Sequence, residues 1–342
     1  GLGVAYGTAE EAHLLNVRAD KMGAYPDQPG HFLQWLESAE GVEARKMVPL
    51  HEPLSAISFV PRKLYGLYLK AEIEKALLEA KGKQITVRLH KAEVVDATLH
   101  ASLPQQIELK TRQEKTVTTL LVDALVLATG NLPPRSHGFS KGLISASQFY
   151  VDNVWQPLLN QRFPQRVSEL SADDEIVIIG AGLTMVDTVL TLKMHGFKGT
   201  ITAISRSGLL PQPHAFGDPY PEWEWIYSTE YAPRTALGLL RRLREEVAAA
   251  EAKGFTWQSV VDSVRPVTQN LWKQLSTTEK RKFLSRLFTL WNVHRHRMAP
   301  EIHTQIRALQ QSGMLKIVAG KIYYIGSDSE GVTVTFRRRG TN

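Results

Sequence analysis

The chain has 342 residues, of which 43% are hydrophobic and 22% charged, which fits a globular protein of about two domains and excludes a mainly disordered, collagen-like or coiled-coil chain. It contains no cysteine, which excludes disulfide frameworks, thiolate zinc sites, Fe–S clusters and redox chemistry by a cysteine pair. The net charge of +7 suits anionic small ligands such as nucleotide phosphates, but it is too small to indicate nucleic acid.

The first quarter of the chain is predicted to contain two helices. Turn-forming residues at 26–30 precede a short amphipathic helix over 31–36. Apolar residues at helical spacing predict a longer helix over 61–81, with Pro61 near its start and Gly82 after its end.

Residues 84–128 change to an alternating pattern that predicts a β-meander. Its short strands are expected at 85–89, 93–101, 105–111 and 116–121. The segment 123–130 is a continuous apolar run that ends in Thr129 and Gly130, which is typical of a buried parallel strand.

A strand–turn–helix–strand unit follows a polar connection over 151–173. A second buried strand is predicted at 175–180, a helix from Leu183 to about His195, and a third strand at 200–205. The length of this segment fits a βαβ unit. Helices are then predicted at 236–252, 256–264, 268–275, 277–288 and 299–312, and strands at 315–319, 322–325 and 332–336.

The turn between the strand at 175–180 and the following helix carries the clearest chemical signal. Gly180 allows a tight turn, and Gly182 has no Cβ, so a pyrophosphate can approach the backbone at the helix N-terminus. Leu183 and Thr184 open this helix, and Thr184 is a candidate to bind a phosphate. Met185 stands at the third glycine position of G-x-G-x-x-G, which weakens the motif, and a tight turn without a ligand is the alternative.

The end of the strand at 200–205 bears on the choice of nucleotide. NAD-binding units often place an acidic residue there, about 20 residues after the glycines, to bind the ribose 2′-hydroxyl. This sequence has Ser205 and Arg206 instead. An arginine suits a 2′-phosphate, so NADP(H) is favoured over NAD(H), with a solvated loop arginine as the alternative.

Several sequence blocks are spread over nearly the whole chain, namely Gly3–Tyr6, His13–Val17, Met22–Pro26, Phe32–Leu36, Phe59–Arg62, Ala128–Gly130, Gly180–Asp187, Ser205–Pro211 and Trp291–Arg297. Together these blocks resemble those of the two-dinucleotide-binding flavoproteins. Within these flavoproteins the chain is similar to a bacterial FAD/NAD(P)-binding family that includes N-hydroxylating monooxygenases acting on aspartate and a urate hydroxylase. The combination is much less specific for any one substrate.

The resemblance implies an α/β fold with two Rossmann-like dinucleotide-binding domains, the FAD domain incomplete, a β-meander and a helical subdomain. The expected divisions are a partial FAD domain at 1–150, an NAD(P) domain at 151–231, a helical insertion at 232–313 and returning strands at 314–342. Gly1-Leu2-Gly3 is the other G-x-G, and no strand precedes it. The segment with the family's first G-x-G-x-x-G is therefore expected upstream of Gly1, and the closing segment that contacts FAD again is expected beyond Arg339.

The resemblance and residue chemistry bear on five further residues. Asn16 is implied to lie near the isoalloxazine, with a loop cap as the alternative. Arg62 is a candidate to bind a phosphate or a substrate carboxylate, with a surface arginine as the alternative. Thr129 and Gly130 are implied to pass under the flavin-domain nucleotide. Asp187 is expected to bind backbone or to pack near the domain interface.

Two other clusters are weaker candidates. His294 and His296 point in different directions on a helix and have no third ligand nearby, so we expect no metal site. An aromatic stretch after Pro213 could line a substrate mouth, although packing of a subdomain is the favoured interpretation. Its members are Phe216, Tyr220, Trp223, Trp225, Tyr227 and Tyr231.

The favoured function is an FAD-dependent NAD(P)H oxidoreductase, namely a monooxygenase that hydroxylates a small polar substrate. Because the cofactor carries the hard chemistry, no catalytic acid or base can be named from the sequence. The alternatives are an NADP(H)-binding fragment or accessory protein without turnover, and a flavin reductase without oxygen insertion. We expect a small-molecule substrate, no nucleic acid, no membrane, and a cytoplasmic location, because the sequence shows neither disulfides nor a signal peptide. The oligomeric state stays open.

Overall fold

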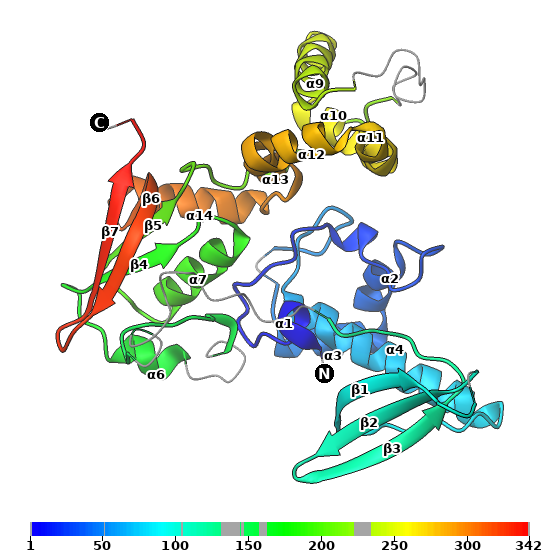
Figure 1. Ribbon diagram of the computed structural model, residues 1–342. Coiled ribbons are helices and arrows are strands. Elements are labelled where there is room, and N and C mark those ends of the chain that lie inside the picture. Colours follow the sequence, from blue (N-terminus) through cyan, green and yellow to red (C-terminus); the bar gives the residue numbers. More distant parts are fainter. Residues whose placement is uncertain are drawn as a thin grey trace.

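The computed structural model describes residues 2–50, 52–103, 105–130, 144, 147–156, 163–221 and 234–340. The described strands form a three-stranded and a four-stranded sheet. These two sheets lie on opposite sides of a group of N-terminal helices, and a second group of helices lies above (Figure 1). In the described part of the chain, no helix combines the length and the apolar character needed to cross a membrane.

The N-terminal helices pack around a core of aromatic rings. Both predicted helices are confirmed, as α2 (His31–Glu37) and α4 (Arg62–Gly82). The shorter elements are α1 (Gly3–Tyr6), η1 (Ala19–Lys21) and α3 (Ala39–Met47). Phe32 and Tyr68 are fully buried, with ring centroids 5.1 Å apart, so α2 and α4 share one core.

The predicted meander is present as an antiparallel sheet in the order β1-β2-β3. Its strands are β1 (Glu93–Leu99), β2 (Ile107–Gln113) and β3 (Thr116–Val122). The prediction of a further strand at 85–89 is wrong, because this segment has no strand pairing and Leu89 is 80% exposed. Apolar alternation marks a segment that can form a strand, but pairing needs a neighbouring strand.

The predicted buried strand at 123–130 is also absent. The segment has no strand pairing, and Val126 and Leu127 are 86% and 78% exposed. A buried parallel strand needs neighbouring strands and covered faces. Among the described strands none pairs with 123–130, so its apolar side chains stay at the surface.

The four-stranded sheet has the order β4-β5-β6-β7. Its strands are β4 (Glu175–Ile179), β5 (Thr200–Ser205), β6 (Leu315–Ser327) and β7 (Val332–Arg338). β4, β5 and the first part of β6 are parallel, whereas β6 and β7 form an antiparallel ribbon. Instead of the two strands predicted over 315–325, β6 is one continuous strand.

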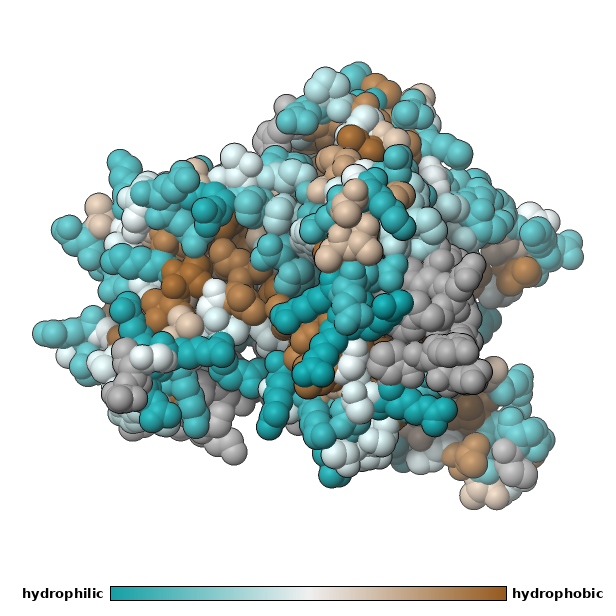
Figure 2. All heavy atoms as spheres, turned by 90° about the horizontal axis from the view of Figure 1, so that it is seen from above, coloured by the Kyte–Doolittle hydropathy of each residue, from teal (hydrophilic) through white to brown (hydrophobic). Residues whose placement is uncertain are grey.

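One core joins this sheet to α7 (Leu183–Met194) and α14 (Pro300–Gln311). Ile201, Ile306 and Val189 are fully buried there. β4 itself is not buried as predicted, since Val177 is 37% exposed. β4 lies at the sheet edge, so it has a described neighbour on one side only. On the face shown in Figure 2, apolar side chains gather over the side of the molecule that contains this sheet.

The chain between β5 and β6 forms the predicted helical segment, which crosses back to a parallel strand. Its elements are α9 (Ala236–Glu251), α10 (Trp257–Ser263), η3 (Arg265–Val267), α11 (Thr268–Gln274), α12 (Thr277–Lys282), the π-helix η4 (Phe283–Leu287) and α13 (Phe288–Arg295). Ala250 and Val260 are fully buried in a small core of its own. A short helix, α6 (Phe163–Ser168), precedes β4.

Candidate functional site

The turn from β4 to α7 forms an open backbone cradle. Gly180 has a φ of +105°, a left-handed value that favours glycine, and its N–H donates to the Ile204 carbonyl at 2.8 Å. Gly182 is the N-cap of α7, and no described side chain caps this helix end. A Cβ added at Gly182 would meet no described atom within 4 Å. The first amides of α7 are therefore free to bind an anion.

The neighbouring strand brings the predicted nucleotide residues to the same sheet edge. β5 runs parallel to β4, so both strands end beside the glycine turn. The Ser205 hydroxyl accepts a hydrogen bond from the Gly208 amide at 3.0 Å, which shapes the loop after β5. The Arg206 side chain is exposed, and the described residues offer it no hydrogen bond or ion pair. Six predicted residues meet here: Gly180, Gly182, Leu183, Thr184, Ser205 and Arg206.

A second group of predicted residues lies where residues 7–18, which we call the N-terminal loop, meet the start of α4. The Leu15 amide donates to the Val60 carbonyl at 2.9 Å, and the Arg62 amide donates to the His13 carbonyl at 2.8 Å. These bonds place Asn16 and the start of α4 on neighbouring stretches of chain. Asn16 is half-buried.

The Arg62 side chain is engaged inside the protein. Its guanidinium lies 2.9 Å from the Asp187 carboxylate, and its Nε donates to the Leu14 carbonyl at 3.0 Å. Burial raises the pKa of Asp187 to about 6, while the positive charge of Arg62 opposes this rise. Arg62 therefore joins the N-terminal loop to α7, and a role in binding a phosphate or substrate carboxylate stays a prediction.

Two polar residues of α7 and the residue that caps its C-terminal end lie on the side of the helix that contacts the N-terminal segment. Asp187, Thr191 and His195 are spaced four residues apart, so they lie along one side of the helix. The buried His13 ring is 2.8 Å from the Thr191 hydroxyl on one side and 2.8 Å from the Thr8 hydroxyl on the other. Burial, with a smaller effect from Arg62, lowers the pKa of His13 to about 4, so the ring is neutral.

His214 joins three segments that are far apart in the sequence. Its Nε2 donates to the Asn16 carbonyl at 3.0 Å, and its backbone amide donates to the Met298 carbonyl at 3.0 Å. Its ring centroid lies 4.9 Å from that of Phe59. The segments around residues 16, 59, 214 and 298 thus meet at one junction.

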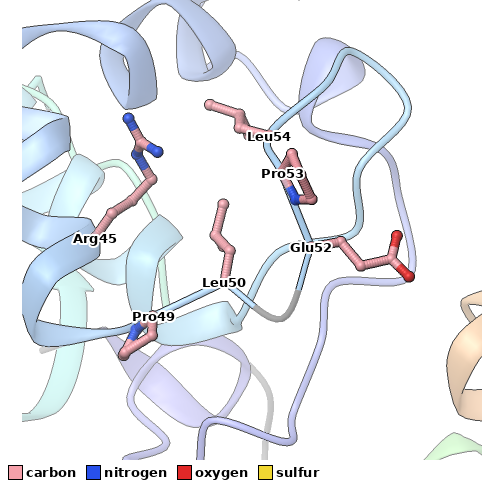
Figure 3. A pocket seen from close by; sticks show the side chains of 6 residues that line it. All are labelled: Arg45, Pro49, Leu50, Glu52, Pro53 and Leu54. Atoms are coloured by element: carbon pink, nitrogen blue, oxygen red, sulfur yellow. The ribbon is translucent and has the colours of Figure 1, made fainter.

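Thr129 and Gly130 are not brought into either group. They lie at the end of the exposed segment 123–130, and among the described residues no hydrogen bond or strand pairing joins them to the glycine turn or to Asn16. A separate pocket of about 400 Å³ lies at the end of α3 and contains none of the predicted residues. Figure 3 shows its Arg45 and Glu52 side chains pointing apart.

The weaker candidates have local partners. His294 Nδ1 bonds to the Leu290 carbonyl at 2.8 Å, and His296 Nδ1 bonds to the Asn292 side-chain oxygen at 2.8 Å. Within the described ranges no group of three histidine, aspartate or glutamate side chains is placed to hold a metal. Tyr220 packs on Phe255 in the helical core. Trp223, Trp225, Tyr227 and Tyr231, which belong to the same prediction, lie outside the described residues.

Comparison with known proteins shows a family match over the first part of the chain and a similarity in fold over nearly all of it. Residues 1–132 match a family model described as FAD-NAD(P)-binding. The whole fold is similar to that of ornithine hydroxylase from Pseudomonas aeruginosa, with a TM-score of 0.53 and 13% identity over 99% of this chain and 68% of that chain. The fold is that of the two-dinucleotide-binding flavoproteins. The resemblance seen in the sequence blocks is thus confirmed at the level of the fold.

Two further enzymes with this flavoprotein fold show the same relationship. Ornithine N-hydroxylase from Kutzneria sp. 744, with reduced FAD, NADP+ and L-ornithine, has a TM-score of 0.51 and 13% identity over 97% of this chain and 66% of that chain. The FAD-bound cadaverine monooxygenase of Erwinia amylovora has a TM-score of 0.50 and 14% identity over 97% of this chain and 66% of that chain. The present chain therefore spans about two thirds of their length.

Sequence reasoning missed His214, Arg297 and Glu10. Arg297 is buried and pairs with Asp262, while Glu10 Oε2 lies 3.1 Å from His195 Nε2. Two of the three lie in or beside blocks that carried the family resemblance. No pattern in the local sequence connects these residues with their partners, because the partners are up to 198 residues away.

Proposed function

We propose that this chain forms the nucleotide-binding framework of an NADPH-dependent flavin monooxygenase that hydroxylates a small polar substrate. The observation that carries the proposal is the open glycine turn at Gly182, with free α7 amides and the exposed Arg206 at the same sheet edge. Free amides suit a pyrophosphate, and a guanidinium suits a 2′-phosphate.

Each predicted site residue has a proposed role in binding one of the two cofactors. Gly180, Gly182, Leu183 and Thr184 would hold the pyrophosphate of NADPH, and Ser205 with Arg206 would hold its ribose phosphate. Asn16, Arg62, Thr129 and Gly130 belong to the flavin side. The flavin supplies the hydride acceptance and oxygen activation when bound, and the protein orients it and excludes water. The divisions at 1–150, 151–231, 232–313 and 314–342 belong to this proposal, and a cytoplasmic location remains a prediction from composition.

The substrate class follows from the proteins that share this fold. Those enzymes are named for ornithine and for cadaverine, which are small molecules with a free amine. We include amines of this kind, together with aspartate, among the substrates to test. The described residues show no acid or base at the glycine turn that would select one of them.

The test starts with the absorbance spectrum of the purified chain, with and without added FAD. We expect visible flavin bands that stay with the protein through gel filtration. In a second assay, we expect the protein to oxidise NADPH and to form a hydroxylated amine. A protein that retains flavin and oxidises NADPH, but releases only hydrogen peroxide with every candidate substrate, would contradict the monooxygenase assignment and favour a flavin reductase.

One observation favours a second candidate, an NADP(H)-binding protein without turnover. The segment 123–130, which would pass under the flavin nucleotide, is unpaired and exposed. If this second function is correct, the purified protein should be colourless and should not take up FAD, but it should still bind NADPH. Titration of intrinsic tryptophan fluorescence with NADPH separates it from a chain that binds neither nucleotide.

A further inference from the structure

We infer that His214 is a positioning residue, which fixes the main chain at Asn16 through a hydrogen bond between the loop after β5 and the N-terminal loop. The inference rests on the proposed function, because the family resemblance only implies that Asn16 lies near the isoalloxazine. Its structural half, the restraint of the loop by His214, stands on the contacts alone.

The loop around Asn16 is held on one side by main-chain bonds. The Leu15 amide donates to the Val60 carbonyl at 2.9 Å, and the Ala19 amide donates to the Ser58 carbonyl at 3.0 Å. Between these two bonds the Asn16 carbonyl accepts from His214 Nε2 at 3.0 Å, across 198 residues of sequence. His214 therefore ties this loop to a second part of the molecule.

His214 is itself held by its backbone and by its ring. Its backbone amide donates to the Met298 carbonyl at 3.0 Å, and the neighbouring Pro213 pairs with Met298 in a parallel bridge. Its ring lies on Phe59, with centroids 4.9 Å apart and planes inclined by 38°. A donor held in this way can set the position of its acceptor, since little freedom remains in the ring.

The charges around the ring keep it a neutral donor. A carbonyl oxygen can only accept, so Nε2 carries the proton. Burial lowers the pKa of His214 to about 4, and the positive charges of Arg297 and Arg18 act in the same direction, against Asp262 and the bond to Asn16. The hydrogen bond thus forms at neutral pH without placing a further positive charge beside Arg297.

Hydrogen exchange of the protein without nucleotide tests the restraint directly. His214→Phe keeps a ring on Phe59 but removes the donor, His214→Gln restores an amide donor at similar reach, and His303→Phe on α14 is the matched control. We expect His214→Phe to speed exchange in the 13–22 peptide by several-fold to about tenfold, as for the loss of one neutral hydrogen bond. His214→Gln should return it towards the wild-type rate, and the control should not change it.

Unchanged exchange in His214→Phe, or an increase spread over the whole chain, would overturn the inference. FAD titration followed by the flavin absorbance gives the second readout. His214→Phe should weaken FAD binding several-fold and lower the product formed per NADPH oxidised, with NADPH affinity unchanged. If the wild-type chain binds no FAD, the proposed function fails, whereas the exchange result still decides the role of His214 as a restraint.

Discussion

The guanidinium of Arg62 and the carboxylate of Asp187 form a buried ion pair between the start of α4 and the first turns of α7. Their side chains are 13% and 8% exposed, and they are 125 residues apart in the sequence. The pair joins the N-terminal helices to the helix that begins at the glycine turn. The contact between these two parts of the molecule therefore depends on charge as well as on apolar packing.

Removing one member of this pair should destabilise the protein strongly. In Arg62→Met the Asp187 carboxylate stays buried without its partner, a change that typically costs about 3–5 kcal/mol. The free energy of unfolding from urea titration measures the effect. Lys46→Met, which breaks an exposed pair with Glu43, is the control and should change stability by less than about 1 kcal/mol. Equal effects of the two variants would show that burial of the Arg62 pair is unimportant.

Stability should fall as the pH is lowered, and His13 should contribute to this fall. Burial depresses the folded-state pKa of His13 to about 4, below the unfolded value of about 6.5. The unfolded chain therefore binds the proton first, so stability present above about pH 6.5 is lost towards pH 4, by about 2–3 kcal/mol. Urea unfolding at several pH values measures this slope.

Variants separate His13 from other groups that titrate in the same range. His13→Gln should flatten the acid loss, whereas the exposed His90→Gln should leave it unchanged. Asp187 acts in the opposite direction, because its raised pKa of about 6 gives stability at low pH that is lost as the pH rises from about 4 to 6. Asp187→Asn should therefore steepen the acid loss. A His13→Gln slope equal to that of the wild type would contradict the assigned shift.

Gly182→Ala should separate nucleotide binding from folding. The φ of Gly182 is −89° and its Cβ position is open, so the unfolding free energy should change by less than about 1 kcal/mol. A methyl group at the cradle should nevertheless weaken NADPH binding by about tenfold or more, because the pyrophosphate can no longer approach the backbone. Gly199→Ala is the contrast, since its Cβ would lie 2.2 Å from the Asp174 carbonyl oxygen. Gly199→Ala should therefore be destabilised. If Gly182→Ala bound NADPH as tightly as the wild type, the glycine turn would not be the pyrophosphate site.

Arg206→Ala should change the preference between the two nicotinamide nucleotides. Loss of a charged contact with the 2′-phosphate should weaken NADPH binding by about 10–100-fold, and NADH binding should change little. Fluorescence titration with each nucleotide measures both constants. Arg244→Ala, at an exposed arginine of α9, is the control for a general loss of positive charge. An equal loss for both nucleotides would argue against recognition of the 2′-phosphate by Arg206.

The sequence predicted most elements because their signals are local. The spacing of apolar residues located α4, and the strand–glycine–helix pattern located β4, α7 and β5. The same local reasoning failed at 85–89 and 123–130. Both segments carry the apolar pattern of a strand, but a strand also needs a partner, and pairing is not encoded within the segment.

The sequence by itself determined the glycine turn, the arginine after β5 and most of the helices and strands, since each follows from short-range geometry and residue chemistry. Only the tertiary structure decided that Arg62 pairs with Asp187, and that His214 holds the Asn16 carbonyl. These contacts join residues more than a hundred positions apart. A polar or charged group that is buried needs a partner, because an unpaired group costs free energy in the interior. The local sequence does not show which residue that partner is.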